Sequence, residues 1–305
     1  MAFTAKDVMT LRQKTGCGMM DCKKALSEAD GDMDKAVDIL REMGLAKTAK
    51  KASRIAAEGV AVAYSDDKAG VALEVNAETD FVAKNADFQA FVKTVADTVL
   101  VENPADVADL LTKKAVGTEM TVAELLQEKI QTIGENIIIR RFVRYEGTVA
   151  TYIHMSGKIS VMVQFDTDVA DKDGFGAYAK DVAMQIAALN TQYLDESDVP
   201  ADVIEHEKEI MIAQMKQDPK MANKPEQVLA KIVGGKVGKF YKENCLVEQE
   251  FVKDNSKTVG SYTKETEKAL GGYIKIIKFV RFEKGEGLEK RSDDFAAEVA
   301  AAVKG

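Results

Sequence analysis

The 305-residue sequence predicts an α+β fold, in which an N-terminal three-helix bundle precedes two similar α+β subdomains with antiparallel sheets. The first 55 residues carry apolar stripes at helical spacing, a strand-and-helix unit then occurs twice, and the second copy contains an extra stretch with the pattern of a helical hairpin. The predicted parts are a helical module with its tether (1–55), a first subdomain (56–145), a second subdomain (146–284) with a hairpin insertion at about 195–243, and a C-terminal module with a short helix (285–305).

The N-terminal module is predicted from three apolar stripes. Val8 and Leu11 begin the first helix, and turns at 15–18 and 30–31 separate it from two more. The stripes of these two helices are Cys22, Ala25, Leu26 and Ala29, and then Ala36, Ile39, Leu40 and Met43. A bundle of this length is of marginal size for an independent core. The alanine- and lysine-rich stretch 44–57 predicts a helical or flexible tether.

The repeated unit can be aligned within the chain itself. Glu58-Gly59 and Tyr64 match Glu146-Gly147 and Tyr152 at an offset of 88. An alternating run typical of a half-buried strand follows at the same offset, and an amphipathic helix comes next in each copy. The strand residues are Val71, Leu73 and Val75 against Ile159, Val161 and Val163; the helical residues are Phe88, Phe91, Val92, Val95 and Val99 against Phe175, Tyr178, Ala179, Val182 and Ile186.

The second copy is longer than the first. Each copy closes on a similar strand, 142–146 and 279–283, where the offset has grown to 137, so the second copy carries 49 extra residues. Within them, 200–217 and 226–243 are rich in helix formers and are separated by prolines, which predicts a projecting helical hairpin with possible homodimerisation as its use. A last helix is expected after Ser292, with Phe295, Val299 and Val303 on one face.

The stretch Thr79-Asp80-Phe81-Val82 is the strongest candidate site. At the offset of 88 the second copy has Thr167-Asp168-Val169, so the Thr-Asp pair is expected to serve the fold in both copies. On the motif alone, a core position for Phe81 and a turn role for Asp80 are the simpler interpretation. The comparison of the copies favours a functional role for Phe81, because the second copy has no aromatic side chain there.

Composition argues against several classes of function. The net charge of −8 does not favour nucleic-acid binding, although residues 1–55 carry a net charge of +3. Two histidines and three cysteines without zinc spacing are too few for a catalytic triad or metal cluster, so no cofactor and no metal site is predicted. Because no apolar run reaches the roughly 20 residues that span a bilayer and no signal-peptide core is present, we expect a cytoplasmic protein without membrane contact.

Four motifs occur in order from one end of the chain to the other. They are Thr15–Leu26, Thr79–Asn85, Ile133–Ile137 and Gly285–Lys290. Together they resemble the bacterial elongation factor Ts family. The resemblance implies a guanine-nucleotide exchange factor, without covalent chemistry of its own, for elongation factor Tu, the GTPase that delivers aminoacyl-tRNA. Such a factor binds both the GDP-bound and the nucleotide-free partner. By thermodynamic reciprocity, the factor lowers the partner's affinity for GDP by as much as GDP lowers the partner's affinity for the factor.

The resemblance also implies which residues act. Thr79, Asp80, Phe81 and Val82 would enter the partner beside its Mg²⁺ site, displace the ion and so release GDP. The remaining partner-binding residues would be Arg12, Met19, Met20, Ile133, Gly134 and His154. Helical periodicity independently places Met20 about 160° from the buried stripe of its helix, facing outward.

Two other classes of function remain open at this stage. The three-helix bundle resembles ubiquitin-associated (UBA-like) modules, so a general protein-binding adaptor is one alternative; it would bind a partner without accelerating nucleotide release. A ribosome- or RNA-associated factor is another, and its affinity for RNA would depend steeply on salt. An enzyme comes last, since catalytic groups are scarce.

Overall fold

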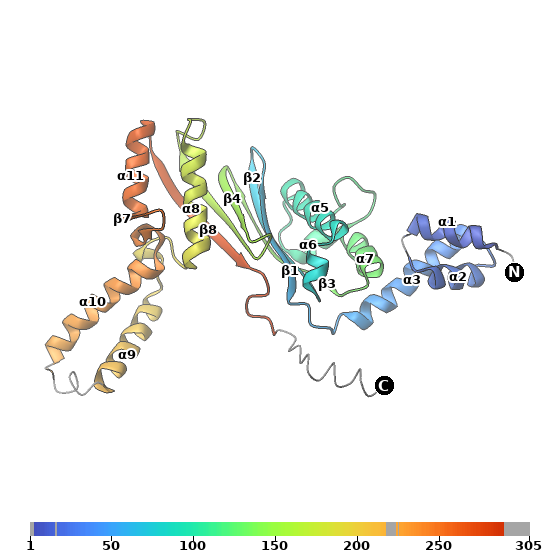
Figure 1. The fold of residues 1–305 in the computed structure, drawn as a ribbon, viewed down its shortest axis with the longest axis horizontal. Helices are drawn as coiled ribbons and strands as arrows, with labels where there is room; N and C mark the ends of the chain where they lie inside the picture. Colours follow the sequence, from blue (N-terminus) through green and yellow to red (C-terminus); the bar gives the residue numbers. More distant parts are fainter. Residues whose placement is uncertain (1–2, 16, 218–223, 225, 290–305) are drawn as a thin grey trace.

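The computed structural model describes residues 3–15, 17–217, 224 and 226–289. Its two three-stranded antiparallel sheets lie at the centre, with helices on the outer side of each sheet, a helical hairpin at one end and a three-helix bundle at the other (Figure 1). The predicted α+β class is confirmed. The predicted C-terminal helix after Ser292 lies outside the described residues. Within the described part of the chain, no helix is both long and apolar enough to cross a membrane.

The N-terminal bundle consists of α1 (Ala5–Thr15), α2 (Met19–Glu28) and α3 (Met33–Lys51). Its core contains the predicted stripe residues Val8, Leu11, Cys22, Ala25, Leu26, Ala29, Ala36 and Leu40. Helix α3 continues without a break through the first part of the predicted tether. It docks on α7 (Val122–Ile133), where Gln127 Nε2 donates to the carbonyl oxygen of Arg41 at 3.0 Å and Lys51 Nζ donates to that of Ile130 at 3.1 Å.

The first copy forms a sheet in the order β1 (Glu58–Ser65), β2 (Ala69–Ala77) and β3 (Ile137–Glu146). One face of this sheet packs against α5 (Ala86–Glu102) and α7 in an apolar core that includes Leu73, Phe88 and Phe91. The short helices α4 (Asp80–Ala83) and α6 (Val107–Thr112) lie in the connections.

The second copy repeats this plan with β4 (Thr148–His154), β5 (Ile159–Thr167) and β8 (Ile274–Glu283), which pack against α8 (Phe175–Leu189) and α11 (Val259–Leu270). Its insertion is the predicted hairpin, formed by α9 (Ala201–Gln217) and α10 (Glu226–Asn244) around a small apolar cluster of its own. The remaining elements are the 3-10 turns Glu196–Asp198 and Leu246–Glu248 and the paired strands β6 (Glu250–Phe251) and β7 (Asp254–Thr258).

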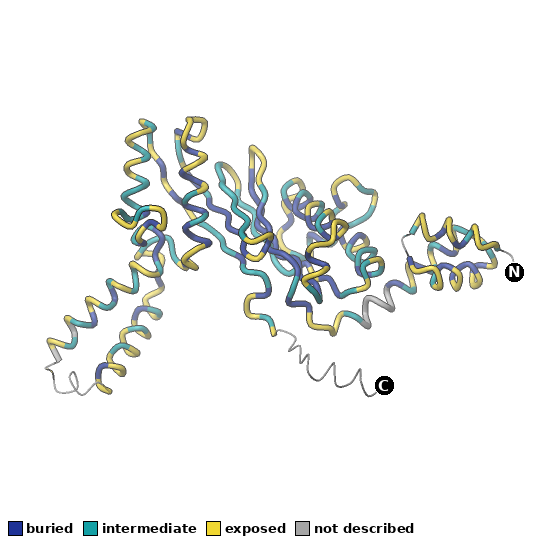
Figure 2. Tube along the Cα trace, in the orientation of Figure 1, coloured by how far each residue is buried: buried dark blue, intermediate teal, exposed yellow. Residues whose placement is uncertain are grey.

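The two sheets pack against each other through small residues. Ala61, Ala63 and Ala72 on the first sheet contact Met162 and Phe282 on the second, and burial concentrates along this seam and under the flanking helices (Figure 2). Alanines allow the two backbones to approach closely, so the two copies form one body rather than two loosely linked ones.

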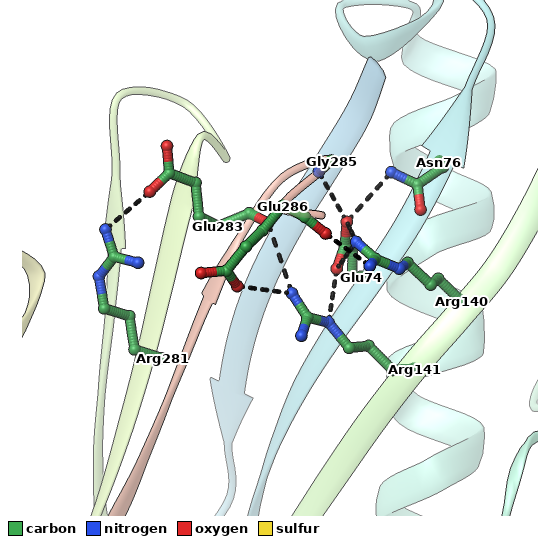
Figure 3. A network of polar contacts seen from close by, with 8 residues as sticks. All are labelled: Glu74, Asn76, Arg140, Arg141, Arg281, Glu283, Gly285 and Glu286. Carbon is green, nitrogen blue, oxygen red and sulfur yellow. Dashed lines mark hydrogen bonds and ion pairs between the residues drawn. The ribbon is translucent and has the colours of Figure 1, made fainter. Parts of the chain in front are cut away.

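A buried carboxylate ties the end of the second copy to the first. Glu74 on β2 is fully buried and accepts hydrogen bonds from Arg140 at 2.9 Å, Arg141 at 2.6 Å and the backbone N–H of Gly285 at 2.8 Å (Figure 3). Because both arginines and a backbone donor satisfy this charge, the network holds the turn after β8 in place. Loss of either arginine would leave a buried charge undercompensated.

Strand pairing corrects the internal alignment. Tyr64, Val71 and Arg144 lie in one row across the first sheet, and Tyr152, Val161 and Arg281 lie in the matching row across the second. The offset is therefore 88 on the first strand but 90 on the middle strand, where the sequence alignment kept it at 88. The cause is the hairpin turn, which has four residues between Ser65 and Gly70 but six between the matching Ile153 and Ser160.

The correction carries over to the residues after the middle strand. Ala77 at the end of β2 matches Thr167, and Glu78 matches Asp168. Both carboxylates do the same work: Glu78 Oε1 accepts the N–H of Asn136 at 2.6 Å, and Asp168 Oδ1 accepts that of Tyr273 at 2.8 Å. The predicted equivalence of Thr79-Asp80 with Thr167-Asp168 is thus wrong by two residues.

Candidate functional site

The candidate site is built on the connection between β2 and α5. Ten residues, 78–87, separate Ala77 from the core residue Phe88, whereas seven residues, 168–174, separate the matching Thr167 from Phe175. The first copy therefore has three residues here without a counterpart in the second. Helix α4, which carries Phe81, lies in this longer connection.

Helix α4 turns Phe81 toward solvent. Thr79 caps the helix, since its Oγ1 accepts the N–H of Val82 at 3.4 Å, and Val82 and Ala83 pack into the core of the first subdomain. At about 100° per residue, inward positions at 82 and 83 leave the preceding two residues on the outer side. Phe81 is accordingly 79% exposed, so the interpretation that it belongs to the core is wrong.

Asp80 is exposed beside Phe81. Its carboxylate pairs with Lys84 Nζ at 2.8 Å, and this hydrogen bond with the lysine holds the pKa of Asp80 below its ordinary value. Lys84 Nζ also lies 5.9 Å from the centre of the Phe81 ring. The capping role in this connection belongs to Thr79, so the fold role expected for Asp80 is carried by its neighbours.

The loop between α7 and β3 is hydrogen-bonded to the residue that caps α4. Glu135 accepts two hydrogen bonds from Thr79, one from its backbone N–H at 3.0 Å and one from its hydroxyl at 2.7 Å. Ile133 ends α7 and is partly buried, and the exposed Gly134 caps the helix in a left-handed conformation. The structure thus brings Ile133 and Gly134 next to the Thr79–Val82 segment, through Glu135.

A groove of about 760 Å³ separates α4 from the turn between β4 and β5. Asp80 and Lys84 line one side, and Ile153 and Met155 line the other. His154, at the end of β4, is half-buried, and its Nδ1 lies 3.0 Å from the hydroxyl of Tyr152. His154 therefore stands at the same turn as the groove, although the side chains that line the groove are its neighbours.

Arg12, Met19 and Met20 are all exposed on the N-terminal bundle, apart from the Thr79–Val82 segment. Arg12 lies on α1, and the two methionines open α2. Met20 is 75% exposed, which confirms its outward orientation. The bundle stands away from the two sheets, so a single rigid partner would have to be large to contact both groups (Figure 1).

Comparison with known proteins identifies the family. A family model described as elongation factor TS matches residues 78–286. Proteins named elongation factor Ts from Syntrophotalea carbinolica and Trichlorobacter lovleyi are each 50% identical to the chain, over 100% and 99% of both lengths; one from Clostridium perfringens is 48% identical over 98% of both. The chain belongs to the elongation factor Ts family. The span of the chain that the family model matches contains α4, the α7–β3 loop and the β4–β5 turn.

Sequence reasoning missed two residues of the site. Glu135 stands in a motif that the sequence singles out, but no local pattern indicates that its partner lies 56 residues earlier. Met155, 68% exposed, sits in the turn that is two residues longer than its counterpart. That extra length is a usable signal, but an alignment at a constant offset hides it.

Proposed function

We propose that this chain is a guanine-nucleotide exchange factor for elongation factor Tu and that Asp80 and Phe81 enter the partner near its Mg²⁺ site. The observation that carries the proposal is the 79% exposure of Phe81 on a capped, anchored turn. An exposed phenylalanine gains about 1.5 to 3 kcal/mol on full burial. Because α4 is anchored by Thr79 and Val82, little of that gain is lost in ordering the loop.

Displacement of Mg²⁺ would link this burial to nucleotide release. The ion and the phosphate loop together hold the phosphates of GDP, so loss of the ion weakens the remaining contacts. Phe81 supplies an apolar wedge, and the exposed Asp80–Lys84 pair can exchange its internal contact for polar groups of the partner. If the chain binds nucleotide-free elongation factor Tu more tightly than the GDP-bound form, it lowers the affinity for GDP by the same factor.

We assign the remaining predicted residues to two contacts. Ile133, Gly134 and His154 would contact the partner around the wedge, whereas Arg12, Met19 and Met20 would make a second contact from the bundle. Exposed methionines adapt readily to a partner surface. Two linked contacts raise the overall affinity when both can engage at once, so docking of the bundle would keep the wedge near its target.

The hairpin would serve self-association rather than exchange. Its helices form their own apolar cluster, and Ile210, Ile212 and Val228 remain exposed. Replacing 200–243 by a short linker should leave GDP release unchanged and abolish any dimer detected by analytical ultracentrifugation. A cytoplasmic location follows from the same proposal, since elongation factor Tu acts in translation.

The direct test is to mix the chain with elongation factor Tu loaded with fluorescent GDP and to follow release by stopped flow. Release should accelerate with chain concentration. In excess chelator the acceleration should shrink, because the ion that the wedge displaces is already gone. Tight binding without acceleration would favour an adaptor instead, and an undiminished acceleration in chelator would remove the Mg²⁺ step from the proposal.

A further inference from the structure

Glu135 is placed to control the orientation of Phe81. Its two carboxylate oxygens accept from the backbone N–H and the hydroxyl of Thr79, at 3.0 and 2.7 Å. The same hydroxyl oxygen accepts the N–H of Val82 at 3.4 Å and so caps α4. Since the hydroxyl proton points to Glu135, the lone pairs of Thr79 Oγ1 stay available for the cap. We infer that Glu135 is a positioning residue for Phe81, an inference that rests on the proposed function.

Helix α4 needs such support because it is short. A single helical turn fixes several backbone angles for very few hydrogen bonds and is not stable alone. Only Asp80–Ala83 belong to α4, and two of these four side chains are exposed. Its geometry therefore depends on the cap at Thr79 and on the core contacts of Val82 and Ala83.

The backbone around Glu135 is itself fixed. The N–H of Asn136 donates to Glu78 at 2.6 Å, and its side-chain amide donates to the carbonyl oxygen of Arg54 at 2.9 Å. Gly134, on the other side, ends α7 with its N–H bonded to the carbonyl oxygen of Ile130. Glu135 thus holds Thr79 from a rigid base rather than from a free loop.

The second copy shows that the fold does not require this carboxylate. From the cap residues Thr121 and Thr258 to the last strands, the copies match at a constant offset of 137, which places Gly272 at the position of Glu135. A Cβ at Gly272 would overlap Val169 Cγ1 and Asp168 Oδ1. In the second copy, which has no exposed aromatic residue in the matching connection, core residues therefore occupy the space beside Gly272. In the first copy, the matching position carries the Glu135 carboxylate, which binds Thr79 at the start of α4.

Exchange kinetics in a double-mutant cycle test the inference. Glu135→Ala should slow GDP release about tenfold, because Phe81 is in the competent orientation for a smaller fraction of the time. Glu135→Gln keeps one carbonyl acceptor and should give an intermediate rate. In a Phe81→Ala background, Glu135→Ala should add nothing. The control is Glu119→Ala, which removes an exposed carboxylate that pairs with Lys114 elsewhere on the subdomain and should leave release unchanged.

A second measurement does not depend on exchange. The chain has no tryptophan, so Phe81→Trp provides a single fluorescent reporter. Glu135→Ala in that variant should lower the fluorescence anisotropy of Trp at 81 in the free chain, while the melting temperature stays close to that of its parent.

The outcomes separate the two proposals. Unchanged anisotropy, or an equal slowing by Glu135→Ala with and without Phe81, would overturn the positioning role. Normal exchange by Phe81→Ala would instead overturn the wedge, and the anisotropy would still decide whether Glu135 orders α4.

Discussion

The two copies of the repeated unit differ most where the middle strand passes into its helix. In the first copy, ten residues make this connection and carry Phe81, which is 79% exposed; in the second, seven residues make it and Val169 is 1% exposed. The strands match row by row, and the helix before the last strand, α7 or α11, matches at the same offset as that strand. The repeat thus supplies a scaffold, and the candidate functional residue lies where the first copy departs from it.

The difference extends to the loop that supports each connection. Val169 matches Thr79 by strand register, and it packs where Gly272 leaves room. In the first copy Glu135 occupies that position and binds Thr79. In the second copy a buried valine fills this space, whereas in the first copy the capped helix α4 follows at this point. Changes in either copy can therefore test which features belong to the fold and which to function.

The largest effect should come from giving the first copy the connection of the second. Replacing 78–87 by the sequence of 168–174, together with Glu135→Gly to make room for the valine, should leave a cooperatively melting protein. GDP release from elongation factor Tu should fall to its spontaneous rate, because α4 and Phe81 are gone. Circular dichroism melting and stopped-flow fluorescence measure the two properties. Loss of cooperative melting would mean that the three extra residues are part of the fold.

A smaller effect, on stability, should separate the two supporting loops. Gly272→Ala should destabilise the chain by about 1 to 3 kcal/mol, because the added methyl group overlaps Val169 and Asp168. The matched change Glu135→Ala should cost about 1 kcal/mol or less, since water can replace the carboxylate at the partly exposed Thr79. Urea unfolding of both variants is the measurement. Equal losses would contradict the assignment of different roles to these positions.

The smallest effect concerns pH. The pairing with Lys84 lowers the folded-state pKa of Asp80 from its ordinary value of 3.8. A lowered folded-state pKa gives stability that is present above the unfolded-state pKa and is lost as pH falls through the folded-state pKa. Lys84→Met should therefore move the Asp80 titration midpoint, measured by NMR, up toward 3.8, with little change in melting because the pair is exposed. An unchanged midpoint would show that Lys84 does not hold the carboxylate.

Local patterns in the sequence were sufficient for most elements of the fold. Val8 with Leu11, and the spacing from Phe88 to Val99, predicted buried helical faces that the structure confirms. The hairpin arms were predicted within one residue at each end, because helix formers and prolines mark them clearly. The exposure of Met20 followed from helical periodicity alone. These features depend on neighbours three to four residues away, which a sequence displays directly.

The alignment of the two middle strands could not be settled in this way. Side chains alternate with a period of two along a strand, so offsets of 88 and 90 place the same kinds of residue on the same face. A chance Thr-Asp pair at 167–168 then favoured the wrong offset. Only the hydrogen-bonded rows, such as Tyr152 with Val161 and Arg281, distinguish the two. The support of Thr79 by Glu135 was hidden for a related reason, since it joins positions far apart in the chain.

The central claim is that Phe81 drives nucleotide release and does not stabilise the fold. Stopped-flow release of fluorescent GDP from elongation factor Tu, measured for the wild-type chain, Phe81→Ala and Val169→Ala beside their melting curves, tests it most directly. Phe81→Ala should slow release about 10- to 100-fold with an unchanged melting temperature, whereas Val169→Ala should lose about 1 to 2 kcal/mol of stability and exchange normally while folded. A Phe81→Ala chain that melts early and exchanges at the wild-type rate when folded would contradict the account.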